Sequence, residues 1–178
     1  MTHEILFAGF GGQGILFSGK VCAYTGLTDD KFVSWLPSYG PEMRGGTANC
    51  HVIISDKPVG SPIIVNPTSL VVMNKPSLTK FENSVVSGGN IIIDSGLVDK
   101  KSERTDINQY LIPATKLANE MNAPKLANMI IFGKLMKVTG IADLETVKKG
   151  LQKSVPPTKQ QLFDVNFKAI ELGYNYED

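Results

Sequence analysis

Four glycines near the start of the chain form the first pattern that could bind a ligand. Residues 9–14, Gly-Phe-Gly-Gly-Gln-Gly, stand between a short apolar run at 5–8 and a segment with helical spacing at 15–24. A strand, a glycine turn and a helix in this order bring free N–H groups and the positive end of a helix dipole together, which favours an anion. We therefore predict a cofactor- or anion-binding loop, with the candidate residues Gly9, Gly11, Gly12, Gln13 and Gly14.

The glycine spacing is that of the dinucleotide fingerprint, which also needs an acidic residue ~20 positions later at the end of the second strand. Asp29 and Asp30 lie at that distance, but they precede the predicted strand 32–36. The strand ends instead at Leu36-Pro37, which cannot hold a ribose. An independent NAD(P)-binding oxidoreductase is therefore the alternative function. A third interpretation is that the glycines only allow close packing.

A second candidate site is the segment 37–46, Pro-Ser-Tyr-Gly-Pro-Glu-Met-Arg-Gly-Gly, whose prolines and glycines exclude a regular element. It carries Arg44, one of only two arginines in the chain, together with Tyr39 and Glu42. A rigid loop with a guanidinium, a carboxylate and a hydroxyl can hold an anion or a partner surface. An internal Glu42–Arg44 pair is an equally good interpretation.

The sequence offers no self-sufficient catalytic group, so no catalytic residue is predicted. His51 follows Cys50 in a predicted strand, and neighbours in a strand point to opposite faces, so they cannot form a nucleophile–base pair. The nucleophile elbow, the Walker A lysine and the zinc-protease motif are all missing from the sequence. The only cysteines, Cys22 and Cys50, exclude a four-cysteine cluster within this chain, and we predict two reduced, buried thiols and no metal site.

Composition limits the classes of protein further. A length of 178 residues predicts one domain, 1–178. The 18 basic and 17 acidic residues give a net charge of +1, which argues against a nucleic-acid binder. Charged residues make up only 20% of the chain, which suggests some surface covered by a partner. No apolar stretch reaches ~18 residues and the start lacks a basic region, so we expect no membrane span and a cytoplasmic protein.

The pattern of elements predicts an α/β fold. We expect a three-layer α/β/α domain with a mostly parallel, mixed sheet and a Rossmann-like start, in which strands 32–36 and 47–55 form an antiparallel insertion. Gly26 and Gly173 are predicted to end helices. The further predicted strands are 70–73, 90–94 and 110–112, and the further helices are 77–81, 114–121, 125–139, 144–154 and 160–172.

Several segments together resemble the γ subunits of 2-oxoacid:acceptor (ferredoxin) oxidoreductases. The glycine loop alone is a weak signal, but the Tyr-Gly-Pro-Glu-Met-Arg-Gly-Gly segment follows it in order and at the right spacing, and the resemblance covers nearly the whole chain. The matching residues are 9–14, 38–50 and 52–56, with Gly88-Gly89, Ile112-Pro113-Ala114, Ala127-Asn128-Met129 and Gly133.

The resemblance implies a role as part of an enzyme complex. Such complexes oxidatively decarboxylate a 2-oxoacid to an acyl-CoA and pass electrons to ferredoxin or another acceptor. Thiamine diphosphate with Mg and the iron–sulfur clusters belong chiefly to the α, β and ferredoxin-like δ subunits, which would be this chain's partners. The γ subunit is then expected to be inactive alone and to lie near the coenzyme A path. The second loop resembles the 2-oxoglutarate type more than the pyruvate type, and branched-chain 2-oxoacids remain open. The competing interpretation is a plain interaction or scaffold domain without a ligand.

Overall fold

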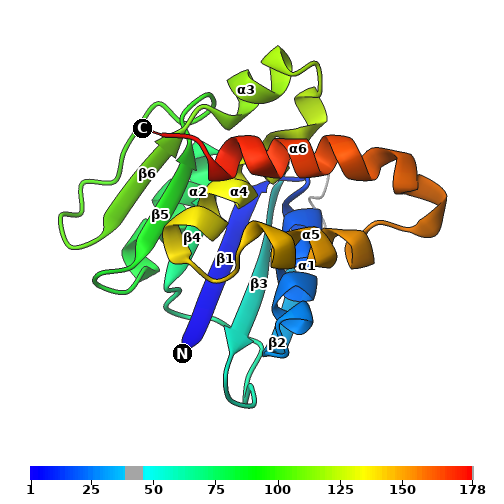
Figure 1. The fold of residues 1–178 in the computed structure, drawn as a ribbon. Helices are drawn as coiled ribbons and strands as arrows, with labels where there is room; N and C mark the ends of the chain where they lie inside the picture. Colours follow the sequence, from blue (N-terminus) through cyan, green and yellow to red (C-terminus); the bar gives the residue numbers. More distant parts are fainter. Residues whose placement is uncertain (39–45, 178) are drawn as a thin grey trace.

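The computed structural model, which describes residues 1–38 and 46–177, is built on one mixed sheet (Figure 1). The sheet has six strands in the order β2-β3-β1-β4-β5-β6. β1, β4, β5 and β6 are parallel, whereas β3 runs antiparallel to both β1 and β2. The predicted antiparallel insertion is therefore confirmed. The strands are β1 (Thr2–Phe10), β2 (Phe32–Ser38), β3 (Thr47–Ser55), β4 (Ser69–Val72), β5 (Asn90–Asp94) and β6 (Asn108–Ile112).

Helices cover the two faces of the sheet unequally. Most of them lie on the face turned toward the viewer in Figure 1, with the last helix across the top of that layer. The other face is covered by α2, whose Leu78 packs with Leu6 and Leu70. Among the described residues, none of the helices has the length and apolar character needed to cross a membrane. The helices are α1 (Ile15–Thr28), α2 (Lys75–Phe81), α3 (Ala114–Glu120), α4 (Ala127–Thr139), α5 (Leu144–Ser154) and α6 (Phe163–Tyr174), with short 3₁₀ turns η1 (Glu82–Ser84), η2 (Pro124–Leu126) and η3 (Pro157–Leu162).

The central strands are buried on both faces, as expected for parallel strands between two layers. Ile5, Phe7 and Ile92 face the larger core cluster under α1 and α4. Leu6 and Ile91 face the smaller cluster on the α2 side. This arrangement explains why the strand sequences are continuous apolar runs, and it confirms the predicted α/β fold with helices on both faces.

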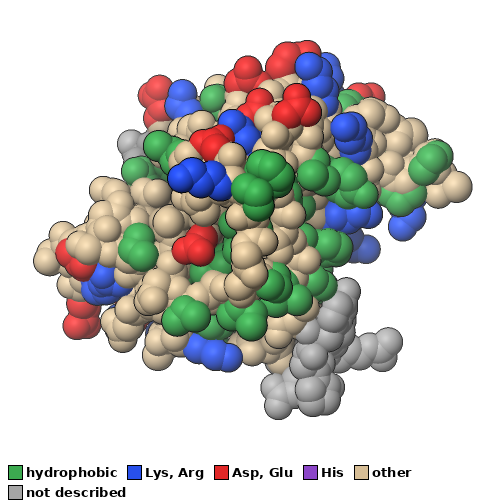
Figure 2. Space-filling model, turned by 90° about the horizontal axis from the view of Figure 1, so that it is seen from below, with side chains coloured by type: hydrophobic (Ala, Val, Ile, Leu, Met, Phe, Trp, Pro, Cys, Tyr) green, Lys and Arg blue, Asp and Glu red, His purple; other side chains and the backbone are tan. Residues whose placement is uncertain are grey.

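The end of the sheet that carries the N-terminus is shown in Figure 2. Hydrophobic side chains form a band down the middle of this face, while Asp and Glu side chains gather along its upper edge. Large apolar residues that remain exposed in the fold include Leu27, Phe32 and Ile63. The low charged fraction of the sequence therefore corresponds to apolar surface that the described residues of this chain leave uncovered.

Two predicted helix ends are wrong. Gly26 lies inside α1, and Gly173 lies inside α6, both buried. α1 ends later, where Asp30 adopts a left-handed conformation with φ of 53°. Both glycines serve close packing instead: a Cβ on Gly26 would meet Val33 and Ile54, and one on Gly173 would meet the carbonyl oxygen of Ile130. Sequence spacing cannot separate a glycine that ends a helix from one that lets a neighbour approach.

A buried carboxylate joins β5 to α3. Asp94 is fully buried and accepts hydrogen bonds from the N–H of Gly96 (3.0 Å), the N–H of Thr115 (3.2 Å) and the Thr115 hydroxyl (2.5 Å). Pro113, which precedes α3, makes no side-chain cap, so Asp94 takes over the capping of that helix from a neighbouring strand. The turn after β5 is thus a structural feature.

Replacing Asp94 with asparagine is expected to lower the free energy of unfolding by about 2–3 kcal/mol, because the amide keeps one acceptor oxygen whereas the buried carboxyl group accepts through both. Urea unfolding followed by circular dichroism measures this. Asp99→Asn is the matched control, since Asp99 is exposed and pairs only with Lys75. Equal stability of the two variants would contradict a capping role for Asp94.

Candidate functional site

The glycine loop lies at the carboxyl end of β1, beside β4. Residues 11–14 connect Phe10, the last residue of β1, to Ile15, the first residue of α1. Gly14 makes no side-chain cap, and the first turn of α1 holds no acidic residue. Within residues 1–38 and 46–177, the first N–H groups of α1 therefore have no intrahelical or capping acceptor, and they are suited to an anion. In open α/β sheets, ligands bind at this end of the strands.

The side chain of Gln13 fixes the shape of the loop. Its Oε1 accepts a hydrogen bond from the N–H of Phe10 (2.6 Å), and its Nε2 donates to the carbonyl of Met73 (2.9 Å). One amide therefore ties the loop to the end of β1 and to the residue after β4. Gln13 was predicted as a ligand-binding residue, and its contacts within the chain make it a positioning residue for the backbone around it.

Gly9 and Gly14 are required by close approaches within the loop. A Cβ on Gly9 would meet Gln13 and Ile15. Gly14 has φ of 76°, and a Cβ there would meet the side chain of Asn128. Asn128 donates from Nδ2 to the Gly14 carbonyl (3.1 Å), so α4 holds the start of α1. Asn128 is not among the predicted site residues, because nothing in its local sequence indicates a contact with Gly14, which lies far away along the chain.

The glycine loop touches one end of the second candidate segment. The N–H of Gly11 donates to the carbonyl of Gly46 at 3.0 Å, and Gly46 leads directly into β3. The predicted residues Tyr39, Glu42 and Arg44 lie outside the described residues. Ser38 and Gly46, which flank that stretch, belong to the same corner of the fold as the glycine loop.

The requirement for a ribose-binding acid is not met. The parallel neighbour of β1 is β4 rather than β2. β4 is followed by Met73 and Asn74, neither of which is acidic. Asn74 caps α2 by accepting from the N–H of Ser77 (2.8 Å). Asp29 and Asp30 follow the far end of α1, as the sequence predicted. The NAD(P)-dependent alternative is therefore not supported.

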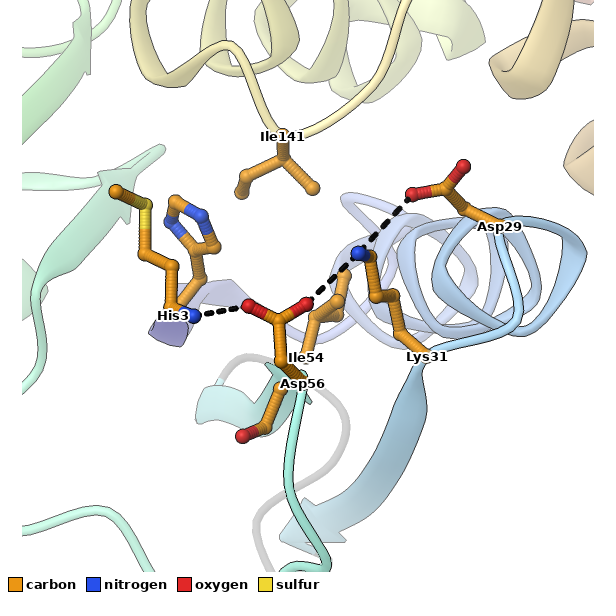
Figure 3. Close-up of a pocket in the computed structure, with 8 residues that line it drawn as sticks. His3, Asp29, Lys31, Ile54, Asp56 and Ile141 are labelled. Atoms are coloured by element: carbon orange, nitrogen blue, oxygen red, sulfur yellow. Dashed lines mark hydrogen bonds and ion pairs between the residues drawn. The ribbon is translucent and has the colours of Figure 1, made fainter.

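A charged hollow of about 170 Å³ lies at the opposite end of β1 from the glycine loop (Figure 3). The carboxylate of Asp56 forms ion pairs with the N-terminal ammonium and with Lys31, whose Nζ lies 2.7 Å from it. These two cations hold the pKa of Asp56 at about 2. Lys31 also reaches Asp29 at 3.7 Å. Because these charges pair with one another, we interpret the hollow as an ion-pair network.

The two cysteines do not fit an iron–sulfur cluster. Both are free and buried where α1 packs on the sheet. Burial raises the pKa of the Cys50 thiol to about 12 and raises that of Cys22 as well, whereas a cluster needs thiolates. Within residues 1–38 and 46–177, no group of three metal-binding side chains occurs. The prediction of buried thiols is confirmed.

His51 and Cys50 point to opposite faces, as predicted. Nδ1 of His51 accepts a hydrogen bond from the N–H of Ile64 (2.9 Å), which fastens the segment between β3 and β4 to the sheet. Burial lowers the pKa of His51 below its usual 6.5, because the charged form would lose water and this acceptor. The structure therefore holds His51 as a neutral, structural side chain.

The lowered pKa predicts a pH dependence of stability. The unfolded chain binds this proton more readily, so the contribution of His51 is fully present above its unfolded pKa and is lost as the pH falls below it. His3, whose pKa is lowered chiefly by burial, acts in the same direction. The free energy of unfolding should be lower at about pH 5.5 than at about pH 7.5, and this difference should be smaller in His51→Gln. An unchanged slope in His51→Gln would contradict this role, and His3→Gln separates the second contribution.

The chain matches one protein family over nearly its whole length. Residues 4–176 match the family Pyruvate ferredoxin/flavodoxin oxidoreductase. The 2-oxoglutarate synthase subunit KorC of Methanocaldococcus jannaschii is 34% identical, and the alignment covers 98% of this chain and 93% of that protein. The ketoisovalerate oxidoreductase subunit VorA of Methanothermobacter marburgensis is 35% identical over 97% of this chain, which spans only 36% of VorA.

Solved structures share the fold. The γ subunit of a keto/oxoacid ferredoxin oxidoreductase from Geobacter sulfurreducens superposes with a TM-score of 0.85 at 28% identity, covering 98% of this chain and 95% of that one. A 2-oxoglutarate:ferredoxin oxidoreductase from Magnetococcus marinus, solved with 2-oxoglutarate, coenzyme A and succinyl-CoA bound, has a TM-score of 0.84 at 22% identity; the match covers 97% of this chain and 30% of that one, which shows the fold alone. The corner of the fold built from the glycine loop, Gln13 and Asn128 lies within the matched residues. The match over residues 4–176 shows that this chain belongs to the pyruvate ferredoxin/flavodoxin oxidoreductase family.

Proposed function

We propose that this chain is the γ subunit of a multi-subunit 2-oxoacid:ferredoxin oxidoreductase that acts on 2-oxoglutarate. The observation that carries the proposal is the end-to-end match to a KorC subunit, which covers 98% of this chain and 93% of the relative. The γ subunit structure from Geobacter sulfurreducens supports it, because both chains are covered almost completely. The complex would convert 2-oxoglutarate and CoA to succinyl-CoA and carbon dioxide and pass electrons to ferredoxin.

The chain would work as one domain, 1–178, without catalysing a step by itself. Its two buried cysteines cannot hold a cluster, and the described residues provide no metal-binding group. Thiamine diphosphate with Mg and the iron–sulfur clusters would therefore reside in the α, β and ferredoxin-like δ subunits. The unpaired thiols favour a reducing compartment, consistent with a cytoplasmic complex.

The glycine loop is the proposed contact with coenzyme A. The uncapped start of α1, held in place by Gln13 and Asn128, offers N–H groups and the helix dipole to a phosphate. Gly12 has open space around its Cα, so a ligand can approach the backbone there. Tyr39, Glu42 and Arg44, from the stretch between β2 and β3, are proposed to complete this contact.

A second candidate substrate is a branched-chain 2-oxoacid, because VorA is as similar to this chain as KorC is. The test is a substrate panel on the complex purified with this chain: 2-oxoglutarate, pyruvate and 2-oxoisovalerate, each with CoA and a viologen acceptor. The proposal predicts the highest kcat/KM for 2-oxoglutarate and no turnover by the chain alone. A preference for 2-oxoisovalerate would show that the substrate is a branched-chain 2-oxoacid instead of 2-oxoglutarate. Absence of activity with every 2-oxoacid would reject the proposed oxidoreductase function.

A further inference from the structure

A cavity of about 380 Å³, which borders the glycine loop at Gly14, lies between α1, the start of α4 and the connection from α5 to α6. Its volume is within the range of small binding pockets. Phe17, Leu126 and Val155 give it an apolar wall. Leu162, on η3, also lines it and remains 44% exposed. The cavity thus has an apolar floor, and Leu162 extends this apolar lining to the surface of the protein.

Three ammonium groups surround this apolar floor. Lys20 comes from α1, Lys125 from η2 and Lys159 from η3. None of them forms an ion pair with a carboxylate of the described residues, whereas Lys31, Lys75 and Lys116 each pair with one. Lys20 instead lies 5.9 Å from the ring of Tyr24. Three separate segments therefore bring positive charge to the rim, and no carboxylate of the described residues pairs with it.

A buried acceptor also lacks a partner at this cavity. Asn128 lines it, is only 3% exposed, and uses Nδ2 for the Gly14 carbonyl, while its Oδ1 has no hydrogen-bond partner in the described part of the chain. Buried polar atoms without partners are rare in folded proteins and usually await a ligand or water.

We propose that this cavity is the docking site for an acidic segment of a partner subunit, which inserts an apolar side chain and places carboxylates against Lys20, Lys125 and Lys159. The inference rests on the proposed function, because it requires that this chain work within a complex. Charge complementarity selects the partner's chemistry: three unpaired lysines around an apolar floor match alternating acidic and apolar residues.

A polypeptide segment fits better than a small anion. The three lysines come from three elements around the rim, and Lys125 and Lys159 are exposed rather than drawn into the cavity. A small anion would leave Leu162 in water, whereas an extended segment would cover it together with Pro156. A chain several residues long can contact ammonium groups on three separate elements together with the apolar floor.

Lysine acetylation of the intact complex tests this inference. The complex, purified without oxygen, and the isolated chain are treated with sulfosuccinimidyl acetate, and mass spectrometry measures modification at each lysine. We expect Lys20, Lys125 and Lys159 to react at least about 10-fold more slowly in the complex, in line with burial of paired charges. Lys101, near β6, is the internal comparison. In a separate sample of the complex that has not been acetylated, a carbodiimide should join the free amines of the three lysines to Asp or Glu of one partner segment, with loss of the activated carboxyl oxygen as a urea.

A charge reversal gives the second arm. Lys125→Glu should reduce the amount of partner subunits that co-purify about 10-fold, whereas Lys101→Glu should leave it unchanged. If the complex forms but the three lysines stay as reactive as in the free chain, the inference is wrong. It is also wrong if protection appears only when CoA is added, since the cavity then belongs to the CoA path. If no partner subunit co-purifies with the unaltered chain, the proposed function itself fails.

Discussion

Gly173→Ala is expected to lower the free energy of unfolding by at least about 3 kcal/mol, and α6 should detach before the rest of the fold unfolds. At this position a Cβ would meet the carbonyl oxygen of Ile130 in α4. Across the same crossing, a Cβ on Gly133 would meet the carbonyl oxygen of Ile170 in α6. Each glycine therefore lets the backbone of the other helix approach, and neither backbone can move without opening the core between them.

The measurement is thermal and urea unfolding of the purified chain by circular dichroism. Gly60→Ala is the matched control, because Gly60 is exposed and, beyond its chain neighbours, no atom of the described residues lies within 4 Å of a Cβ there. That control should change stability by less than about 0.5 kcal/mol. If Gly173→Ala were as stable as Gly60→Ala, the packing of α6 on α4 would differ from the one described.

Gln13→Glu is expected to raise the KM of the complex for CoA about 10-fold with little change in kcat at saturating CoA. The carboxylate can still accept from the N–H of Phe10, but it cannot donate to the carbonyl of Met73. It also places a negative charge at the uncapped start of α1, where a CoA phosphate is proposed to lie. One unit of repulsion at a few ångströms is worth about 1–4 kcal/mol near a protein surface.

Asn119→Asp provides the matched control for Gln13→Glu. It makes the same change from amide to carboxylate at an exposed position of α3. Steady-state viologen reduction with varied CoA gives both constants. A KM for CoA that stays at the control value, in a Gln13→Glu complex that assembles normally, would remove the glycine loop from the CoA path.

The fold was predictable where local pattern and topology agree. The short spacing between the predicted strands 32–36 and 47–55 left no room for a crossover helix, so the antiparallel insertion followed from sequence alone. The glycines misled the prediction of helix ends, because Gly26 and Gly173 are needed by residues distant in sequence. The predicted helices 125–139 and 160–172 begin too early, within the 3₁₀ turns η2 and η3. Helix propensity does not distinguish a 3₁₀ turn from the first turn of an α-helix.

The position of the glycine loop was predictable, but its contacts were not. The order strand, glycine loop, helix puts the loop at the carboxyl end of β1, where Gly14 makes no side-chain cap to α1, and the binding of an anion there stays a prediction. The contacts of Gln13 with Met73 and of Asn128 with Gly14 join residues 60 and 114 positions apart. Such contacts depend on which strands become neighbours, and the pairing of β1 with β4 rather than β2 also removed the dinucleotide interpretation.

Purification of the tagged chain from its native cell without oxygen, followed by an assay of the eluate, tests the role as a γ subunit most directly. We expect larger subunits to co-purify and viologen reduction to require both 2-oxoglutarate and CoA. A chain that elutes alone and without activity under the same gentle conditions would contradict its role as a γ subunit.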